Sequence, residues 1–269
     1  MKKSIEPIEK SNFCIEVKNL RVSYGRHLVI KGLNLYLPKG ELIGILGPNG
    51  AGKTTLIHSI SGFLKAEGTI NIFGKNLKDL SSKERAALIS LLPQTTQTPF
   101  LFSVIDIVKM GRFIKDEPDE KKREIALKAL KRCNIEHFAQ RPFLHLSGGE
   151  RQLVLLARCL CQNSPIFLLD EATSNLDIKR KIQVFEILRQ EVERNKRSIL
   201  IVIHDINLAS MYLDRLIFIK DGLVVKSGAV NEVVSERVIK DVFEANAIVI
   251  KHPQVQRPAV LFSKPNSSI

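Results

Sequence analysis

The segment Gly47-Pro48-Asn49-Gly50-Ala51-Gly52-Lys53-Thr54 decides the fold of this chain. Its glycines, lysine and threonine match the spacing G-x-x-x-x-G-K-[ST] of a phosphate-binding loop, the P-loop. A chance match in a chain of 269 residues is expected on the order of once in a hundred. Glycines let such a loop curl around an anion without Cβ clashes, and the amides that open the next helix favour bound phosphate.

The residues on either side of this loop have the periodicity that a P-loop requires. Leu42–Leu46 is a short apolar run typical of a buried strand, and the apolar residues of 56–64 recur at helical spacing. In this context Lys53 can contact the β- and γ-phosphates, and the Thr54 hydroxyl can ligate Mg²⁺. The alternative, an ordinary glycine-rich turn, has little support.

Two adjacent carboxylates follow a second buried strand, which we predict at Ile166–Leu169. A P-loop site needs a carboxylate to orient the metal, and Asp170 at the strand end supplies it. Adjacent residues in a strand-end turn can point in different directions, so Glu171 is predicted to polarise a water at the γ-phosphate. Without the preceding strand and Asp170, a glutamate such as Glu171 would more often be a surface carboxylate.

Three further polar residues lie at the ends of predicted elements. Gln94 follows the apolar Leu91-Leu-Pro, and His204 follows the apolar strand Ile199–Ile203, where strand ends would meet a nucleotide. Taken singly, His204 is more often a structural histidine and Gln94 a loop hydrogen-bonder. Asp177 is predicted to cap the helix that begins at the next residue.

The segment Leu146-Ser147-Gly148-Gly149-Glu150-Arg151-Gln152 opens an amphipathic helix between Gln94 and the strand that ends in Asp170. It resembles the signature motif of ATP-binding cassette (ABC) ATPases. The order of motifs, from Tyr24 through the P-loop to Ser174-Asn-Leu-Asp177 and His204, resembles that family over roughly residues 13–263. Ser147 and the amides of Gly148 and Gly149, at a helix N-terminus, are suitable anion donors.

The resemblance implies an ATPase with ATP and Mg²⁺ as cofactors. It also implies a dimer, because the signature serine and glycines of one cassette close over the γ-phosphate held by the P-loop of another. The working unit would be two copies of this chain, or this chain and a related one, with two ATP molecules at their interface.

The same resemblance implies a role for each motif residue. Tyr24 would stack on adenine, and Asp177 would communicate across the dimer. The catalytic set would be Glu171 as base or water-orienter, His204 at the γ-phosphate and Gln94 as a sensor of Mg²⁺. The metal would be held by Thr54, Gln94 and Asp170. The nucleotide-binding set would comprise Tyr24, Gly47, Pro48, Asn49, Gly50, Ala51, Gly52, Lys53, Thr54, Thr55, Ser147, Gly148, Gly149 and Asp177.

The fold class is predicted to be α/β: a P-loop NTPase core with a mainly parallel sheet, an N-terminal antiparallel β subdomain and an inserted α-helical subdomain. The antiparallel part rests on strands predicted at Phe13–Val17, Leu20–Tyr24 and Leu33–Leu37. The parallel part rests on the alternation of strands and helices after residue 166. We place the core at about 13–94 and 163–263, the helical subdomain at about 95–162, an extension at 1–12 and a tail at 264–269. Near the end, a helical piece at Glu236–Phe243 precedes two apolar runs.

Two segments indicate which transport process the ATP hydrolysis would drive. The stretch from Phe102 to Arg112 and the tail around Pro258–Phe262 are similar to cassettes of metal-chelate importers, which take up ferric siderophores, haem or cobalamin. This similarity implies transmembrane permease subunits as partners, indirectly a substrate-binding protein, and a peripheral location on the cytoplasmic face of the cell (inner) membrane. The chain departs from the family at Ala172, where proline is usual, and its Gly62–Gly68 connection is short.

Composition and charge leave a second possibility open. Lys and Arg number 41 against 28 Asp and Glu, a net charge of +13 that suggests polyanionic partners: nucleic acid, an anionic lipid surface or phosphorylated ligands. The alternatives are an ABC-type ATPase that acts on nucleic acid, ribosomes or iron–sulfur assembly, or the cassette of an exporter. The chain has one P-loop and no sustained heptads, so we expect no nucleic acid. A small-molecule P-loop kinase would leave the signature segment without a role.

The remaining composition is that of a cytosolic globular chain. Hydrophobic residues make up 44% of it, enough for a sizeable core. Its apolar runs are far shorter than the roughly 18 residues that cross a bilayer, and its first twelve residues lack the apolar region of a secretory signal. Four cysteines without C-x-x-C spacing are predicted to be buried thiols.

Overall fold

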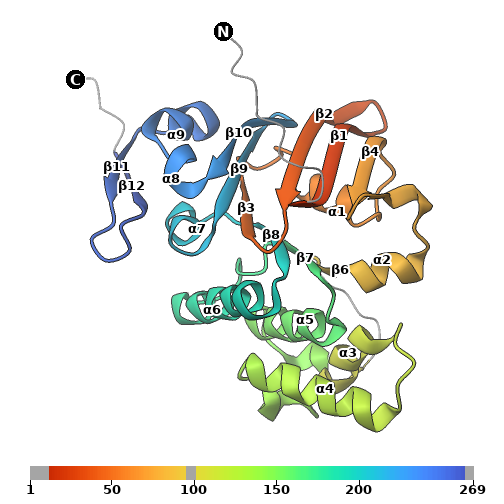
Figure 1. Ribbon diagram of the computed structural model, residues 1–269. Helices are drawn as coiled ribbons and strands as arrows, with labels where there is room; N and C mark the ends of the chain where they lie inside the picture. Colours follow the sequence, from red (N-terminus) through yellow and green to blue (C-terminus); the bar gives the residue numbers. More distant parts are fainter. Residues whose placement is uncertain (1–11, 95–100, 264–269) are drawn as a thin grey trace.

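The computed structural model describes residues 12–94 and 101–263, and a six-stranded sheet lies at its centre (Figure 1). In spatial order the strands are β10 (Leu223–Ala229), β9 (Arg215–Lys220), β3 (Leu42–Leu46), β8 (Ser198–Val202), β7 (Ile166–Asp170) and β6 (Ile89–Leu92). Neighbouring strands from β9 to β6 pair in parallel, and β10 pairs antiparallel with β9. The mainly parallel sheet predicted from the sequence is therefore confirmed.

Both faces of this sheet are covered, which explains why its central strands are apolar throughout. Along β3, Ile43 and Ile45 belong to an apolar cluster shared with helix α1 (Lys53–Ile60) and the N-terminal strands. Leu42 and Leu46 belong to a second cluster, shared with α5 (Gly148–Gln162) and α6 (Ile178–Asn195). The alternation of side chains along each strand thus builds two cores from one apolar run.

The N-terminal antiparallel sheet has the strand order β2-β1-β4-β5. Its strands are β1 (Phe13–Tyr24), β2 (His27–Pro38), β4 (Glu67–Ile72) and β5 (Lys75–Asn76). The two separate strands predicted at 13–17 and 20–24 are one continuous strand, because the pairing shifts register between Val17 and Leu20 rather than breaking. Asn19 forms this bulge with φ 48°, a conformation that asparagine tolerates. Strand β2 also begins earlier than predicted, at His27.

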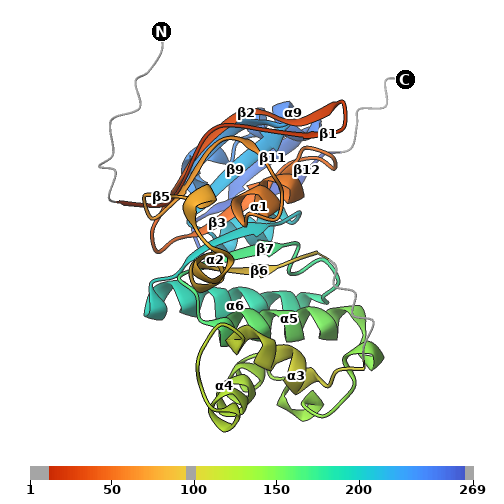
Figure 2. The same cartoon turned by 90° about the vertical axis from the view of Figure 1, so that its right-hand side faces the viewer.

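The predicted insert and helix α6 lie on the face of the six-stranded sheet opposite the N-terminal strands. Figure 2 shows α5 and α6 next to the sheet and α3 (Val104–Lys109) and α4 (Asp119–Arg132) farther from it. Helix α4 buries Ala126, Ala129 and Leu130, and most of its charged residues are exposed to solvent. The predicted start of the helical subdomain at residue 95, and most of the predicted extension and tail, lie outside the described residues.

The C-terminal part adds small elements beside the sheet (Figure 1). Helices α7 (Ile206–Tyr212), α8 (Val230–Val233) and α9 (Glu236–Phe243) precede a hairpin of β11 (Ala247–Lys251) and β12 (Pro258–Phe262). Helix α9 has the bounds that the sequence predicts, and the two apolar runs after it form the hairpin. The remaining elements are α2 (Ser82–Leu88) and the 3₁₀ turns η2 (Leu77–Asp79), η3 (Met110–Arg112), η4 (Glu136–Phe138) and η5 (Phe143–His145).

Two properties predicted from composition can be checked in the described part of the chain. All four cysteines are buried thiols, and burial raises the pKa of Cys133 to about 12. Across residues 12–94 and 101–263, none of the helices combines the length and apolar character needed to cross a bilayer.

Candidate nucleotide-binding and catalytic site

The P-loop connects the end of β3 to the first residue of α1, as the sequence predicts. It is held close to the sheet: a Cβ at Gly47 would lie 2.0 Å from the carbonyl oxygen of Ile219 in β9, so only glycine fits there. The amide of Leu56 donates to the Gly52 carbonyl at 2.9 Å, which starts the helix directly after the loop. The first-turn amides of α1 therefore lie at the loop, where an anion is favoured.

Lys53 is a buried cation at the base of this loop. Its Nζ donates to the carbonyl oxygens of Gly47 at 2.9 Å and Pro48 at 2.8 Å, and only 7% of the residue is exposed. Burial lowers the pKa of Lys53, and the nearby carboxylates of Glu171 and Asp170 oppose that shift. The ammonium group is thus held next to the anion-binding amides of the loop.

Asp170 and Thr54 meet where β7 ends beside α1. Thr54 Oγ1 donates to Asp170 Oδ1 at 3.1 Å, and Asp170 is fully buried. Burial raises the pKa of this carboxyl, with the Thr54 hydrogen bond acting in the opposite direction. Within the described residues Asp170 Oδ2 is buried without a hydrogen-bond partner. A hydroxyl beside a carboxylate with an unused oxygen is the donor set that Mg²⁺ takes together with phosphates, so these residues fit the ion.

Glu171 is the meeting point of three strand ends. Gln94 Nε2, after β6, donates to Glu171 Oε2 at 2.9 Å. His204 Nε2, after β8, lies 2.7 Å from Glu171 Oε1, and because a carboxylate only accepts, the ring nitrogen is the donor. The sequence placed these three residues at strand ends, and the fold brings them together at the carboxyl edge of the sheet.

The backbone of Glu171 is left-handed, with φ 54°. Such a conformation costs about 1 kcal/mol or more for a residue with a Cβ, so its surroundings must hold it. Ala172, which replaces the usual proline, is buried in the core below the turn. The turn is also closed by the Ser174 amide, which donates to the Glu171 carbonyl at 3.1 Å.

Gln152 is a buried residue of this site that the sequence analysis missed. Its Nε2 donates to the Glu171 carbonyl at 2.7 Å and to Ser174 Oγ at 3.2 Å. Its Oε1 accepts from the Asn175 amide at 3.3 Å. One signal was present in the sequence: Gln152 lies one helical turn before Leu156, on the apolar stripe of α5, where a polar side chain needs a buried partner.

The signature residues open α5 and lie against the Asn175 segment of their own chain. Ser147 Oγ accepts from the Glu150 amide at 3.3 Å, while the Glu150 carboxylate accepts from the Ser147 amide at 2.9 Å, which makes a capping box. A Cβ at Gly149 would lie 2.8 Å from the Asn175 carbonyl oxygen. Among the described residues, no hydrogen bond links Ser147, Gly148 or Gly149 to the P-loop.

The two remaining predicted site residues lie at the margins. Tyr24 ends β1, opposite His27, and is 52% exposed, without a hydrogen bond to the P-loop in the described structure. Asp177 caps α6 as predicted, since its Oδ1 accepts from the Arg180 amide at 2.8 Å. Neither residue is drawn into the cluster around Glu171.

Comparison with known proteins assigns this arrangement to a family. The family model described as "ABC transporter" matches residues 30–174. The chain belongs to the ABC transporter family. It is the ATP-binding cassette of that family, whose ATP-binding subunits are ATPases, which confirms the resemblance found in the sequence.

Two relatives are similar over almost their whole length. The iron(3+)-hydroxamate import ATP-binding protein FhuC of Bacillus subtilis (strain 168) is 32% identical over 252 residues, which cover 92% of this chain and 94% of FhuC. The hemin import ATP-binding protein HmuV of Pseudomonas aeruginosa is 36% identical over 253 residues, which cover 92% of this chain and 99% of HmuV.

Solved structures give the same result for the fold of this cassette. A chain described as part of an ABC transporter of metal-chelate type, in an inward-facing conformation, superposes with a TM-score of 0.80 at 26% identity, covering 94% of this chain and 98% of the other. The cassette MJ0796, a dimer in a post-hydrolysis state with ADP and Pi, superposes with a TM-score of 0.75 at 31% identity, covering 80% of this chain and 98% of the other.

Proposed function

We propose that this cassette is the ATP-hydrolysing subunit of an importer that takes up a metal chelate of the ferric siderophore, haem or cobalamin class. The observation that carries the proposal is the extent of the similarity to FhuC and HmuV, both named import ATP-binding proteins. The general family model ends at residue 174, whereas these relatives match 92% of the chain. The match therefore continues into the C-terminal region, beyond the motifs that the general family model covers.

The first step at the site is the binding of Mg²⁺ and ATP. Thr54 Oγ1 and the carboxylate of Asp170 would hold the ion, which supplies positive charge to the phosphate oxygens. Lys53 would exchange the two loop carbonyls that it now contacts for the β- and γ-phosphates. Tyr24, at the end of β1, would stack on the adenine ring.

Hydrolysis needs a water aligned with the γ-phosphate, and Glu171 is the residue placed to orient it. The Glu171 carboxylate accepts hydrogen bonds from Gln94 and His204, and both side chains would leave it for the nucleotide, so that its oxygens can accept from the water. His204 would contact the γ-phosphate, and Gln94 would turn toward the metal when nucleotide is bound. A positioned general base of this kind contributes roughly 10²–10⁴-fold to the rate.

The site becomes complete only with a second cassette. Ser147, Gly148 and Gly149 contact their own capping box and the Asn175 segment, so the anion donors of the signature would have to come from another copy. We therefore propose a homodimer with two ATP molecules at its interface, in which Asp177 of each copy lies near the other. The dimeric state of the related cassette MJ0796 supports this arrangement.

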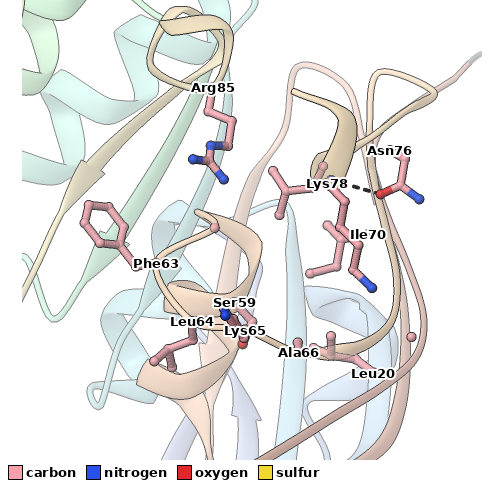
Figure 3. A pocket seen from close by; sticks show the side chains of 13 residues that line it. Leu20, Ser59, Phe63, Leu64, Lys65, Ala66, Ile70, Asn76, Lys78 and Arg85 are labelled. Carbon is pink, nitrogen blue, oxygen red and sulfur yellow. Dashed lines mark hydrogen bonds between the residues drawn. The ribbon is translucent and has the colours of Figure 1, made fainter. Parts of the chain in front are cut away.

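The permease would dock on a pair of adjoining hollows, one within the core and one between the core and helix α5. One hollow has a volume of about 540 Å³ and is lined from the loop after α1, from α2 and from strand β4 (Figure 3). A second, of about 480 Å³, shares Gly62, Phe63 and Arg85 with the first and reaches Arg158 and Gln162 of α5. A permease helix seated here would touch both parts of the cassette, and the short Gly62–Gly68 connection would form its seat.

Phe63 supports this location because 76% of it is exposed at the edge of both hollows. Exposed aromatic side chains beside a hollow are typical of protein interfaces. The permease would hold the cassette as a peripheral subunit at the cytoplasmic face of the inner membrane, and a substrate-binding protein would deliver the chelate on the other side.

The function is tested by purifying the tagged chain from detergent-solubilised membranes and reconstituting what co-purifies. We expect a polytopic permease, and ATP-driven uptake of a ferric hydroxamate, haem or cobalamin by the reconstituted complex. The Phe63→Asp variant should lose the permease, while Leu223→Asp, an exposed apolar residue on β10, should retain it. Recovery only with nucleic acid or ribosomes would overturn the transport function and leave the ATPase in place.

The catalytic assignment has a separate test in Glu171→Gln. This variant keeps the shape of the side chain and loses the base, so it should bind ATP with wild-type affinity and hydrolyse it about 10²-fold or more slowly. Hydrolysis at the wild-type rate would show that Glu171 is not the water-orienting residue.

A further inference from the structure

The C-terminal hairpin brings an aromatic ring to the catalytic site. Phe262, at the end of β12, lines a hollow of about 440 Å³ whose walls also include Glu171, Ser174 and His204. The ring is 60% exposed, although most large apolar side chains of this chain are buried. Phe262 lies outside every nucleotide-binding motif, so its place in this wall calls for an explanation of its own.

The position of Phe262 is fixed relative to His204 by hydrogen bonds. Asn207, in the first turn of α7, donates from Nδ2 to the Val260 carbonyl at 3.1 Å and accepts from the Val260 amide at 2.8 Å. Ser210 Oγ also donates to the Pro258 carbonyl. Because α7 begins two residues after His204, β12 and the His204 segment form one connected unit.

The two faces of the hairpin differ in what they contact. Val260 is 2% exposed and packs on the core, and Phe262, two residues later, continues the same face past the end of the packed region. Leu261 points to the opposite face, where it pairs with Ile248, and both are about half exposed. Phe262 and Leu261 are therefore adjacent, similarly exposed residues that face different surroundings.

We propose that Phe262 forms part of the contact between two copies of this chain when ATP closes the dimer. This inference rests on the proposed function, in which a second cassette closes over the nucleotide beside Glu171 and His204. Phe262 lies in the wall of that same hollow, so its ring is continuous with the surface that the second copy covers. A large apolar ring held rigidly at such a rim gains from being covered, and aromatic residues dominate the binding energy of interfaces. A two-fold dimer would contain this contact twice.

The test measures ATP-dependent dimerisation in the Glu171→Gln background, in which bound ATP persists. Light scattering coupled to size-exclusion chromatography gives the fraction of dimer over a titration of Mg-ATP. Phe262→Asp should raise the ATP concentration for half-maximal dimerisation by about tenfold or more, because it removes an aromatic contact and places a charge in an apolar interface. Leu261→Asp, the matched control on the opposite face, should leave the titration unchanged. Binding of a fluorescent ATP analogue to monomer should be equal in all three proteins.

The outcomes separate this inference from the function on which it rests. If the Glu171→Gln protein does not dimerise with ATP, the proposed cassette dimer fails. If it dimerises and Phe262→Asp dimerises at the same ATP concentration, or if Leu261→Asp weakens it equally, the Phe262 contact is wrong and the dimer stands. Phe262→Ala carries the same test should the aspartate variant fail to fold, with a smaller expected increase.

Discussion

Replacing Gln152 by methionine should slow ATP hydrolysis without weakening ATP binding. Methionine has nearly the same length and packs well in apolar surroundings, so the change removes mainly the polar contacts. Those contacts are one hydrogen bond to the Glu171 carbonyl, one to Ser174 Oγ and one from the Asn175 amide. They join the signature helix to the turn that carries Glu171, the proposed catalytic carboxylate.

The loss of stability depends on which hydrogen bonds the partners of Gln152 keep in the variant. The Glu171 carbonyl still accepts from the Ser174 amide, whereas Gln152 is the hydrogen-bond partner that the structure gives for the Asn175 amide. Three hydrogen bonds of about 1 kcal/mol each, partly compensated, give a loss of about 1–3 kcal/mol in the free energy of unfolding. For a chain of this size, that loss lowers Tm by roughly 2–10 °C.

The fall in kcat should be larger than the loss in the free energy of unfolding alone would suggest. Glu171 has φ 54°, and its turn relaxes when the amide that holds it is removed. A displacement of the carboxylate by about 1 Å can cost up to about 100-fold in rate, so we expect kcat to fall by about 10–100-fold. KM for ATP should change little, because Gln152 contacts neither Lys53 nor Thr54.

Steady-state ATPase assays and thermal unfolding by circular dichroism measure these quantities. The matched control is Gln162→Met on the same helix, which loses the hydrogen bonds from Nε2 to the Ala86 carbonyl at 2.7 Å and the Ile89 carbonyl at 2.9 Å. It should lower Tm by a similar amount and keep the wild-type kcat. If both variants lose activity in proportion to Tm, or if Gln152→Met keeps the full kcat, the positioning role of Gln152 is refuted.

Three further substitutions probe separate parts of the site. Lys53→Ala removes the buried ammonium beside the loop amides and should abolish nucleotide binding in isothermal titration calorimetry; retained binding would contradict the role of this loop. Asp170→Asn should raise the Tm of the nucleotide-free protein at pH 7–8, because burial raises the pKa of Asp170 and its ionised form therefore destabilises the fold. That gain in Tm should shrink as the pH falls through this pKa, where the wild-type carboxyl becomes neutral. A gain independent of pH would show that the ionisation of Asp170 does not cause the destabilisation. Ser147→Arg in the Glu171→Gln background should bind ATP and remain monomeric in size-exclusion chromatography, and an ATP-induced dimer would contradict the signature's role in closure.

The parts of the fold that the sequence predicted are those set by local pattern. The apolar runs at Leu42–Leu46 and Ile166–Leu169 specify buried strands, and the P-loop spacing specifies the turn between one of them and a helix. Helix α9 and the cap at Asp177 follow from short-range preferences, so their bounds were correct. The bulge at Asn19 was missed because it depends on pairing with two other strands, which joins what appear in sequence as two strands.

The site was predictable to the same extent. Thr54, Asp170, Gln94, Glu171 and His204 each lie at the carboxyl end of a strand or the start of a helix, and a parallel sheet brings such ends together. Gln152 and Phe262 contact elements that lie far from them in the chain. No local sequence pattern predicts that Gln152 donates to the Glu171 carbonyl, or that Phe262 lines the hollow beside Glu171. Only the packing of α5 against the sheet and of β12 against α7 supplies that information.

Hydrogen bonds made by helix α5 explain how a permease docked at the two hollows could influence Glu171. Gln152 lies on α5, and the same helix lines the second docking hollow with Arg158 and Gln162, while Arg158 donates to the Leu91 carbonyl at 3.3 Å. A shift of α5 imposed at the hollow would therefore reach the β6 strand that leads to Gln94 and, through Gln152, the turn at Glu171. Helix α5 is therefore hydrogen-bonded both to the strand that precedes Gln94 and to the turn that carries Glu171. The helix that carries the signature thus links the proposed docking surface to the proposed water-orienting carboxylate by direct contact.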